Sequence, residues 1–157
     1  MQGIEFKPDY VQHLPAGLTV EALVRQLARP LIADGQVVED FADYVLAREE
    51  TFPTGLPTEP VGVAIPHTDH RHVHHNAFGL GILPAPVSFA DMAGEPDPVP
   101  VRVVFLLALS ESNKQLNALG WIMELIQDSD FMQELLTMSD KAIYHAISDK
   151  MTERGEV

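Results

Sequence analysis

The stretch from Val99 to Leu109 is apolar at almost every position and rich in valine after Pro100. A strand with one face in water alternates apolar and polar residues, and a surface helix repeats them with a period near 3.6. A short run that is apolar throughout is typical of a strand buried on both faces. The chain is therefore expected to form a sheet that other elements cover on both sides.

Four shorter segments supply further strand candidates. The run from Val61 to Ile65 is mostly β-branched and stops at Pro66, as a buried strand would. Asn76 to Leu83 has the composition of a third strand, and Val87–Phe89 predicts a small extra one. Ile4 to Phe6 is expected to open a short edge strand, whereas Pro53-Thr54-Gly55 predicts a turn.

Helical spacing dominates the segments before and after these strands. Thr19 predicts an N-cap for a helix that runs to about Ile32, with Pro30 expected to kink it or end it early. Gly35 is expected to end the first helix, and a second amphipathic helix is expected from Val38 to about Glu50.

Three more helices are expected in the C-terminal third. The first starts near Asn113, the second is capped by Ser129 or Asp130, and the last by Ser139 or Asp140. Helices before and after a group of strands predict one α/β domain over residues 1–157, a three-layer α/β/α sandwich.

Composition excludes several classes of function. The chain of 157 residues has no cysteine, which rules out disulfides, thiolate metal sites and a cysteine nucleophile. Ten Lys and Arg against 23 Asp and Glu give a formal net charge of −13, so nucleic acid is not an expected partner. The sequence contains no apolar run long enough to span a bilayer, which predicts a cytoplasmic protein without direct membrane insertion.

His67 is the strongest candidate for chemistry because it directly follows a predicted buried strand. Ligands of open α/β sheets bind at the carboxyl ends of strands. A neutral imidazole keeps a nitrogen lone pair that can attack an activated phosphoryl group. In a chain without cysteine, His67 is the natural covalent carrier.

A phosphoryl acceptor also needs donors for the phosphoryl oxygens. Arg48, near the end of the second predicted helix, is expected to supply a guanidinium fork, with Glu49 holding it. Gln115 stands in the first turn of the helix after Leu109, at the same sheet edge as His67 if the two strands are parallel. Without a Gly-x-x-x-x-Gly-Lys-Ser/Thr loop, the expected donor is a phosphoprotein.

The other histidines leave two readings open. His70, His72, His74 and His75 follow His67 within nine positions, so they are either solvated loop residues or part of a metal-binding domain. His72 and His74 would share one face of a strand, and His67, His70 and His74 nearly one face of a helix. Pro66 and the loop setting support neither arrangement, and no His-Glu-x-x-His motif is present. The solvated interpretation is favoured, with no metal and no cofactor expected.

The ordered motifs resemble a known family. Arg48-Glu49, Pro53-Thr-Gly-Leu56, Gly62-Val-Ala-Ile-Pro-His67 and Gln115-Leu-x-x-Leu119 look like the IIA component of the fructose/mannitol class of the bacterial phosphoenolpyruvate-dependent sugar phosphotransferase system. The resemblance covers residues from about 19 to 148 and implies a central mixed β-sheet flanked by helices.

The resemblance also implies a mechanism and partners. His67 would accept a phosphoryl group, through Nε2, from the phosphocarrier protein HPr and donate it to a IIB component, which serves the membrane-embedded IIC. Arg48 would belong to that site. Many members carry a second histidine where this chain has Gln115, and the galactitol-type branch is more similar there and in the Thr-Phe-Pro-Thr-Gly stretch. Galactitol or a related sugar alcohol is the expected cargo.

Two further expectations concern role and surface. A regulatory protein of the same fold, whose phosphorylation state is read by a partner, would share His67 and is the alternative to a transport subunit. Phe52 and Leu56 are expected on the rim that partners use to reach His67. A backbone carbonyl and Asp69 are both left open as the group that orients the second ring nitrogen.

Overall fold

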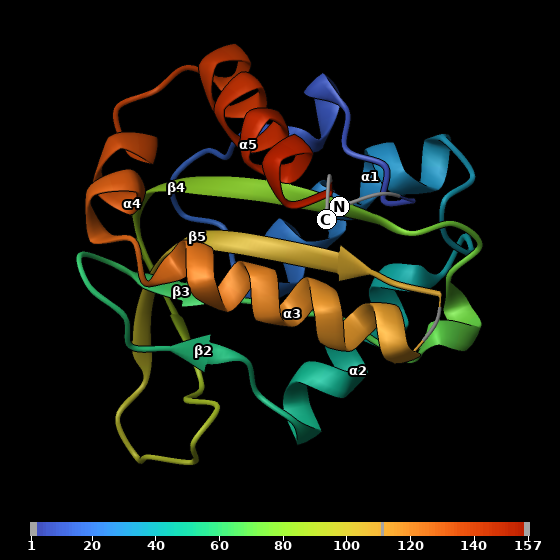
Figure 1. Ribbon diagram of the computed structural model, residues 1–157. Helices are drawn as coiled ribbons and strands as arrows, with labels where there is room; N and C mark the ends of the chain where they lie inside the picture. Colours follow the sequence, from blue (N-terminus) through green and yellow to red (C-terminus); the bar gives the residue numbers. More distant parts are fainter. Residues whose placement is uncertain (1–2, 111, 156–157) are drawn as a thin grey trace.

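The computed structural model describes residues 3–110 and 112–155, with side chains over 3–110 and 117–153. Its centre is a five-stranded sheet in the order β1-β4-β5-β3-β2 (Figure 1). The strands are β1 (Val11–His13), β2 (Gly55–Leu56), β3 (Gly62–Ala64), β4 (Ala77–Phe89) and β5 (Val99–Ala108). β1 with β4 and β3 with β5 are parallel pairs, and the other two pairs are antiparallel, so the sheet is mixed as expected.

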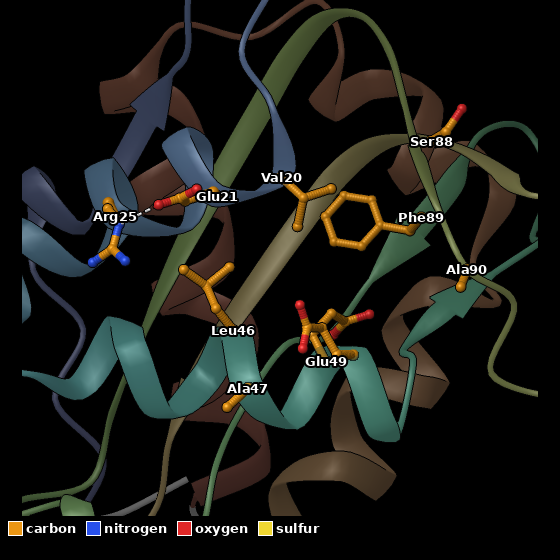
Figure 2. Close-up of a pocket in the computed structure, with 10 residues that line it drawn as sticks. Val20, Glu21, Arg25, Leu46, Ala47, Glu49, Ser88, Phe89 and Ala90 are labelled. Carbon is orange, nitrogen blue, oxygen red and sulfur yellow. Dashed lines mark hydrogen bonds and ion pairs between the residues drawn. The ribbon is translucent and has the colours of Figure 1, made fainter.

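Helices cover both faces of this sheet. Figure 1 shows α3 and α5 in front of the strands and α1 behind them, and Figure 2 shows α1 and α2 on that second face. The helices are α1 (Val20–Ala33), α2 (Phe41–Thr51), α3 (Ser112–Ile126), α4 (Ser129–Leu135) and α5 (Asp140–Gly155), with 3-10 turns η1 (Pro8–Tyr10) and η2 (His70–His72). The three-layer α/β/α prediction is confirmed. Within the ranges described, none of these helices has the length and apolar character needed to cross a bilayer.

The core lies mainly between the long strands and the helices on each side. β5 is buried at eight of its ten positions, which confirms the reading of that stretch as a central strand. On one face Leu27 of α1 is fully buried. On the other, Phe78 of β4 stacks on Phe6 with ring centroids 4.4 Å apart and meets the edge of Trp121 from α3.

The amino-terminal edge of the sheet differs from the prediction. Between Ile4 and Phe6 there is only an isolated bridge from Glu5 to Ala77, and the edge strand is β1, further along the chain. The reason is that the Phe6 ring packs into the aromatic cluster, while Pro8 opens a 3-10 turn before β1 begins.

Proline does not end α1 early, because its missing hydrogen bond is replaced. Pro30 lies inside the helix, which continues to Ala33 before Gly35, at φ +71°, stops it. A proline at position 30 leaves the carbonyl of Gln26 without its helical donor. The side-chain amide of Gln12, from β1, donates to that carbonyl at 3.2 Å. The N-cap prediction for this helix is confirmed, since Thr19 accepts from the Ala22 amide at 3.1 Å.

Other element boundaries are corrected by tertiary contacts. The second helix begins at Phe41, not at Val38, because Val37 and Val38 pair with the loop at 72–73 and the chain then turns at 39–40. The turn expected at 53–55 leads into β2, and the extra strand expected at 87–89 is the end of β4, after a register shift beyond Ile82.

The cap of α4 is Asp128, not Ser129 or Asp130, and the cap of α5 is Ser139, one of the two expected. Asp128 accepts from the Phe131 amide at 3.1 Å and Ser139 from the Ala142 amide at 3.2 Å. The expected helix order in this third is confirmed.

We predict that Gly55→Ala destabilises the protein, because its new Cβ would lie 2.6 Å from the backbone oxygen of Ala90. That oxygen accepts the Gly55 amide at 3.0 Å and cannot move away freely, so we expect a loss of about 1–3 kcal/mol in the free energy of unfolding. Gly120→Ala is the control, since open space surrounds its Cβ inside α3, and it should add roughly 0.5–1 kcal/mol. Urea midpoints measure both; equal midpoints for the two variants would contradict the prediction.

Candidate functional site

His67 lies at the carboxyl edge of the sheet, just after β3. The regular strand ends at Ala64, and the carbonyl of Pro66 still accepts from the Leu107 amide of β5 at 3.0 Å. Because β3 and β5 are parallel, both chains leave the sheet at this edge, as the sequence predicted conditionally. His67 is thus held against the end of β5.

The imidazole of His67 is half-buried in a largely apolar niche. Thr68, Leu107, Leu109 and Leu119 share with it a cavity of about 10 Å³, which has room for about one water molecule. A group transferred to the ring therefore has to arrive from its solvent side. The His67 ring is therefore partly buried and partly exposed to solvent.

One ring nitrogen of His67 has a fixed partner. Nδ1 lies 2.8 Å from the carbonyl oxygen of Ile65. A carbonyl accepts only, so Nδ1 carries the proton and Nε2 keeps its lone pair. Asp69, the other group left open for this role, instead binds His70 and Arg71. The backbone orients the ring.

Burial lowers the pKa of His67 below its ordinary value of 6.5. The hydrogen bond to Ile65 acts in the opposite direction, and the positive charge of Arg48 lowers the pKa further. A lowered pKa favours the neutral ring near neutral pH, so the Nε2 lone pair is available there.

Arg48 and Glu49 follow each other near the end of α2 but have different partners. The Arg48 guanidinium lies over the ring of Phe52, 4.6 Å from its centroid, and Phe52 is 57% exposed. The expectation that Glu49 holds Arg48 is wrong, because both Glu49 oxygens accept from Thr54, each at 2.8 Å. Neighbouring helix residues point in directions about 100° apart, which separates the two side chains.

Thr54 connects Glu49 to the histidine segment and was not singled out in the sequence. Its hydroxyl donates to Glu49 and accepts from the Ile65 amide at 3.2 Å. Thr54 is 2% exposed, and burial raises the pKa of the Glu49 carboxyl, against the opposing effect of the Thr54 bonds. A threonine between proline and glycine next to a Glu-containing helix end was the available signal.

Asn76 anchors the other side of this sheet edge, and no sequence pattern pointed to it. Its side-chain oxygen accepts from the amide and hydroxyl of Ser110, at 2.6 and 2.9 Å. This fixes the residue that follows Leu109, just before α3. Gln115 belongs to α3, but its side chain lies outside the described residues, and the sequence-based assignment to the site stays a prediction.

The remaining histidines of the cluster are spread along the following loop. His70 pairs with Asp69, His72 stacks on Tyr44 with centroids 3.6 Å apart, and His74 and His75 are exposed. Among the residues with described side chains, no three His, Asp or Glu groups converge as metal ligands would.

Comparison with protein families matches residues 5–150 to the family described as "Phosphoenolpyruvate-dependent sugar phosphotransferase system, EIIA 2". This match covers nearly the whole chain, so the protein belongs to that family. PTS IIA components are phosphotransfer proteins, and the resemblance inferred from the motifs is confirmed.

Curated relatives include two carbohydrate-specific components. The galactitol-specific EIIA component of Escherichia coli K12 is 26% identical over 118 residues, 75% of this chain and 78% of the relative. The ascorbate-specific PTS system EIIA component of Mycoplasma pneumoniae is 29% identical over 159 residues, 96% of each chain.

Solved structures share the fold. The mannitol-specific cryptic phosphotransferase enzyme IIA CmtB from Escherichia coli has a TM-score of 0.71 at 17% identity, covering 91% of this chain and 94% of that one. The complex of enzyme IIA and phosphorylated enzyme IIB for mannitol from the same organism contains a chain with a TM-score of 0.56 at 23% identity, covering 85% and 98%. Both support the three-layer architecture.

We predict that His67 titrates below pH 6.5 and that Arg48→Gln raises its pKa without restoring the ordinary value, because burial is the larger cause. An NMR titration of the His67 ring protons measures both. Arg71→Gln is the control, since Arg71 pairs with Asp69 and is not among the causes of the shift. A wild-type pKa at or above 6.5, or an identical pKa in Arg48→Gln, would show that the electrostatic picture is wrong.

Proposed function

We propose that this protein is a cytoplasmic phosphocarrier that accepts a phosphoryl group on Nε2 of His67 and passes it to a IIB component. The observation that carries the proposal is the Nδ1 contact to the Ile65 carbonyl, which leaves Nε2 as the nucleophilic nitrogen on a half-buried ring. The family membership supplies the reaction class, transfer between proteins of a sugar phosphotransferase system.

In the proposed step, the Nε2 lone pair attacks the phosphorus of a donor phosphohistidine on HPr. A new N–P bond forms as the donor's N–P bond breaks, and the donor imidazole leaves with the electron pair. The Nδ1 proton of His67 stays on the ring and donates a hydrogen bond to the Ile65 carbonyl, which stabilises the positive charge that develops. Transfer to IIB reverses these roles, and IIB serves the membrane-embedded IIC.

The surroundings of His67 support this chemistry. Arg48 brings positive charge to the ring, and its exposed partner Phe52 adds apolar area to the rim where HPr and IIB would dock. Leu56, the other expected rim residue, is half-buried. Gln115 is proposed as a neutral donor to the phosphoryl oxygens. The net charge of −13 favours encounter with basic partner surfaces.

The proposed cargo is galactitol or a related sugar alcohol. The galactitol-specific relative supports this assignment, as does the glutamine at position 115. The ascorbate-specific relative makes ascorbate the competing substrate to include in any assay. A purely regulatory role, with phosphorylation read by a partner, is the alternative.

We predict that His67→Ala abolishes phosphate incorporation from phosphoenolpyruvate through enzyme I and HPr, because the accepting nitrogen is removed. Labelled phosphate on the wild type should be acid-labile and alkali-stable, as expected for a phosphohistidine. His74→Ala, an exposed histidine of the same loop, is the matched control and should incorporate label normally. Acid-labile label on His67→Ala would refute the site.

The same relay, completed with the cognate IIB and IIC in vesicles, tests the transport role. Phosphorylation of galactitol supports the proposal, whereas phosphorylation of ascorbate alone overturns the assignment of galactitol as the substrate. Labelled protein that supports no sugar phosphorylation would favour the regulatory alternative.

We predict that Arg48→Ala slows phosphoryl transfer to His67 by roughly 10²-fold, the usual effect of removing a charged donor from a developing anion. Arg48→Lys should be intermediate, since it keeps the charge and loses the planar fork. Gln115→Ala should cost less than Arg48→Ala, because a neutral donor is weaker than a charged one. Rapid-quench kinetics measure all three, and a larger loss in Gln115→Ala than in Arg48→Ala would contradict these roles.

A further inference from the structure

The segment that orients His67 is held by a chain of hydrogen bonds that starts at Glu49, near the end of α2. Glu49 accepts from the amide and the hydroxyl of Thr54, and the Thr54 oxygen accepts from the Ile65 amide. The carbonyl of the same Ile65 accepts from His67 Nδ1. Three hydrogen-bonded links therefore separate the Glu49 carboxylate from the reacting imidazole.

The Thr54 hydroxyl oxygen can accept a hydrogen bond from the Ile65 amide only when the hydroxyl hydrogen is directed to another acceptor. A hydroxyl has one hydrogen to donate and lone pairs to accept with. Since that hydrogen goes to Glu49 Oε1, a lone pair faces the Ile65 amide. The second Glu49 oxygen, Oε2, accepts from the Thr54 amide. The two carboxylate oxygens of Glu49 thus accept from the two donors of Thr54, its amide and its hydroxyl.

Ile65 and Pro66 are then fixed from both sides. The Ile65 amide is held by Thr54, its side chain is 3% exposed, and the Pro66 carbonyl accepts from Leu107. Proline also fixes its own φ. With these restraints the Ile65 carbonyl has one direction, toward Nδ1 of His67, and one tautomer of the ring is selected.

We propose that Glu49 is a positioning residue for phosphoryl transfer, which acts through Thr54 and Ile65 to keep the lone pair of His67 on Nε2. The inference rests on the proposed function of His67. Glu49 touches neither the ring nor the transferred group; it acts through residues that do. An unrestrained neutral imidazole populates both tautomers, and only one presents a nucleophilic Nε2.

Glu49 lies outside the niche around His67. Figure 2 shows Glu49 on α2, in a groove of about 510 Å³ that is also lined by Phe89 and Ala90. The niche around the ring is lined by a different set of residues. Glu50 lines the same groove, is exposed and stands outside the Thr54 network, so it offers a matched control of identical charge.

The test combines Glu49→Gln with Glu50→Gln and reads two quantities in each. Gln offers one acceptor oxygen and presents an NH2 group to the second Thr54 donor, so Glu49→Gln should release Thr54. We expect the ¹⁵N spectrum of His67 to shift from the Nδ1–H tautomer toward a mixture, and the rate of phosphorylation by phospho-HPr to fall about 10- to 100-fold. Glu50→Gln should match the wild type in both readouts.

A second pair of variants covers the case in which Glu49→Gln does not fold, as judged by thermal melting. Thr54→Ser keeps the hydroxyl and should retain the tautomer and the rate. Thr54→Val has a similar shape but leaves the Ile65 amide without its acceptor, and should reproduce Glu49→Gln. Equal behaviour of the serine and valine variants would overturn the proposal.

The outcomes separate this inference from the proposed function. A wild-type protein that accepts no phosphoryl group refutes the function of His67. A wild type in the Nε2–H tautomer, or a Glu49→Gln variant that transfers slowly with an unchanged tautomer, refutes the positioning role. The ¹⁵N measurement needs no phosphoryl donor, so it stands whatever the relay assay shows.

Discussion

The parallel pairing of β3 with β5 is the constraint on which the site depends. It brings the chain after Ala64 and the chain after Ala108 to the same edge, with the Pro66–Leu107 hydrogen bond continuing the ladder. A slip of one residue would turn the side chains of β3 to the opposite face. Gly62 helps to fix the register, because a Cβ there would lie 2.4 Å from the Pro100 oxygen, next to the register shift between Gly62 and Val63.

The sequence predicted the features that depend on local pattern and composition. The buried β5, the Thr19 cap and the place of His67 follow from apolar periodicity, capping chemistry and a proline-ended strand. The sequence did not predict which distant segments pair with one another. The edge strand β1 is too short and mixed to be distinctive, and Gln12 replacing the donor lost at Pro30 is visible only once β1 lies beside α1.

The same limit explains the errors at the site. Arg48 and Glu49 are adjacent and oppositely charged, so a pair between them was the simplest expectation. In the fold they serve different neighbours, and no carboxylate pairs with Arg48 among the described side chains. Asp69 is likewise engaged by Arg71 and His70. Positive charge near His67 thus remains available to an anion in a chain with a formal charge of −13.

These contacts give the three short motifs a common physical meaning. Arg48 and Glu49 are adjacent near the end of α2, and their side chains diverge because a helix turns about 100° per residue. Arg48 lies over the Phe52 ring, whereas Glu49 lines the groove and accepts from Thr54. Pro53-Thr-Gly55 then brings one hydroxyl within reach of both Glu49 and Ile65, and its glycine permits the close approach to Ala90. In Ile-Pro-His67, the third motif, the Ile65 carbonyl is held in place and accepts the hydrogen bond that orients the His67 ring. Under the proposed function, Arg48 supplies positive charge near His67, and Glu49 supports the segment that orients the ring.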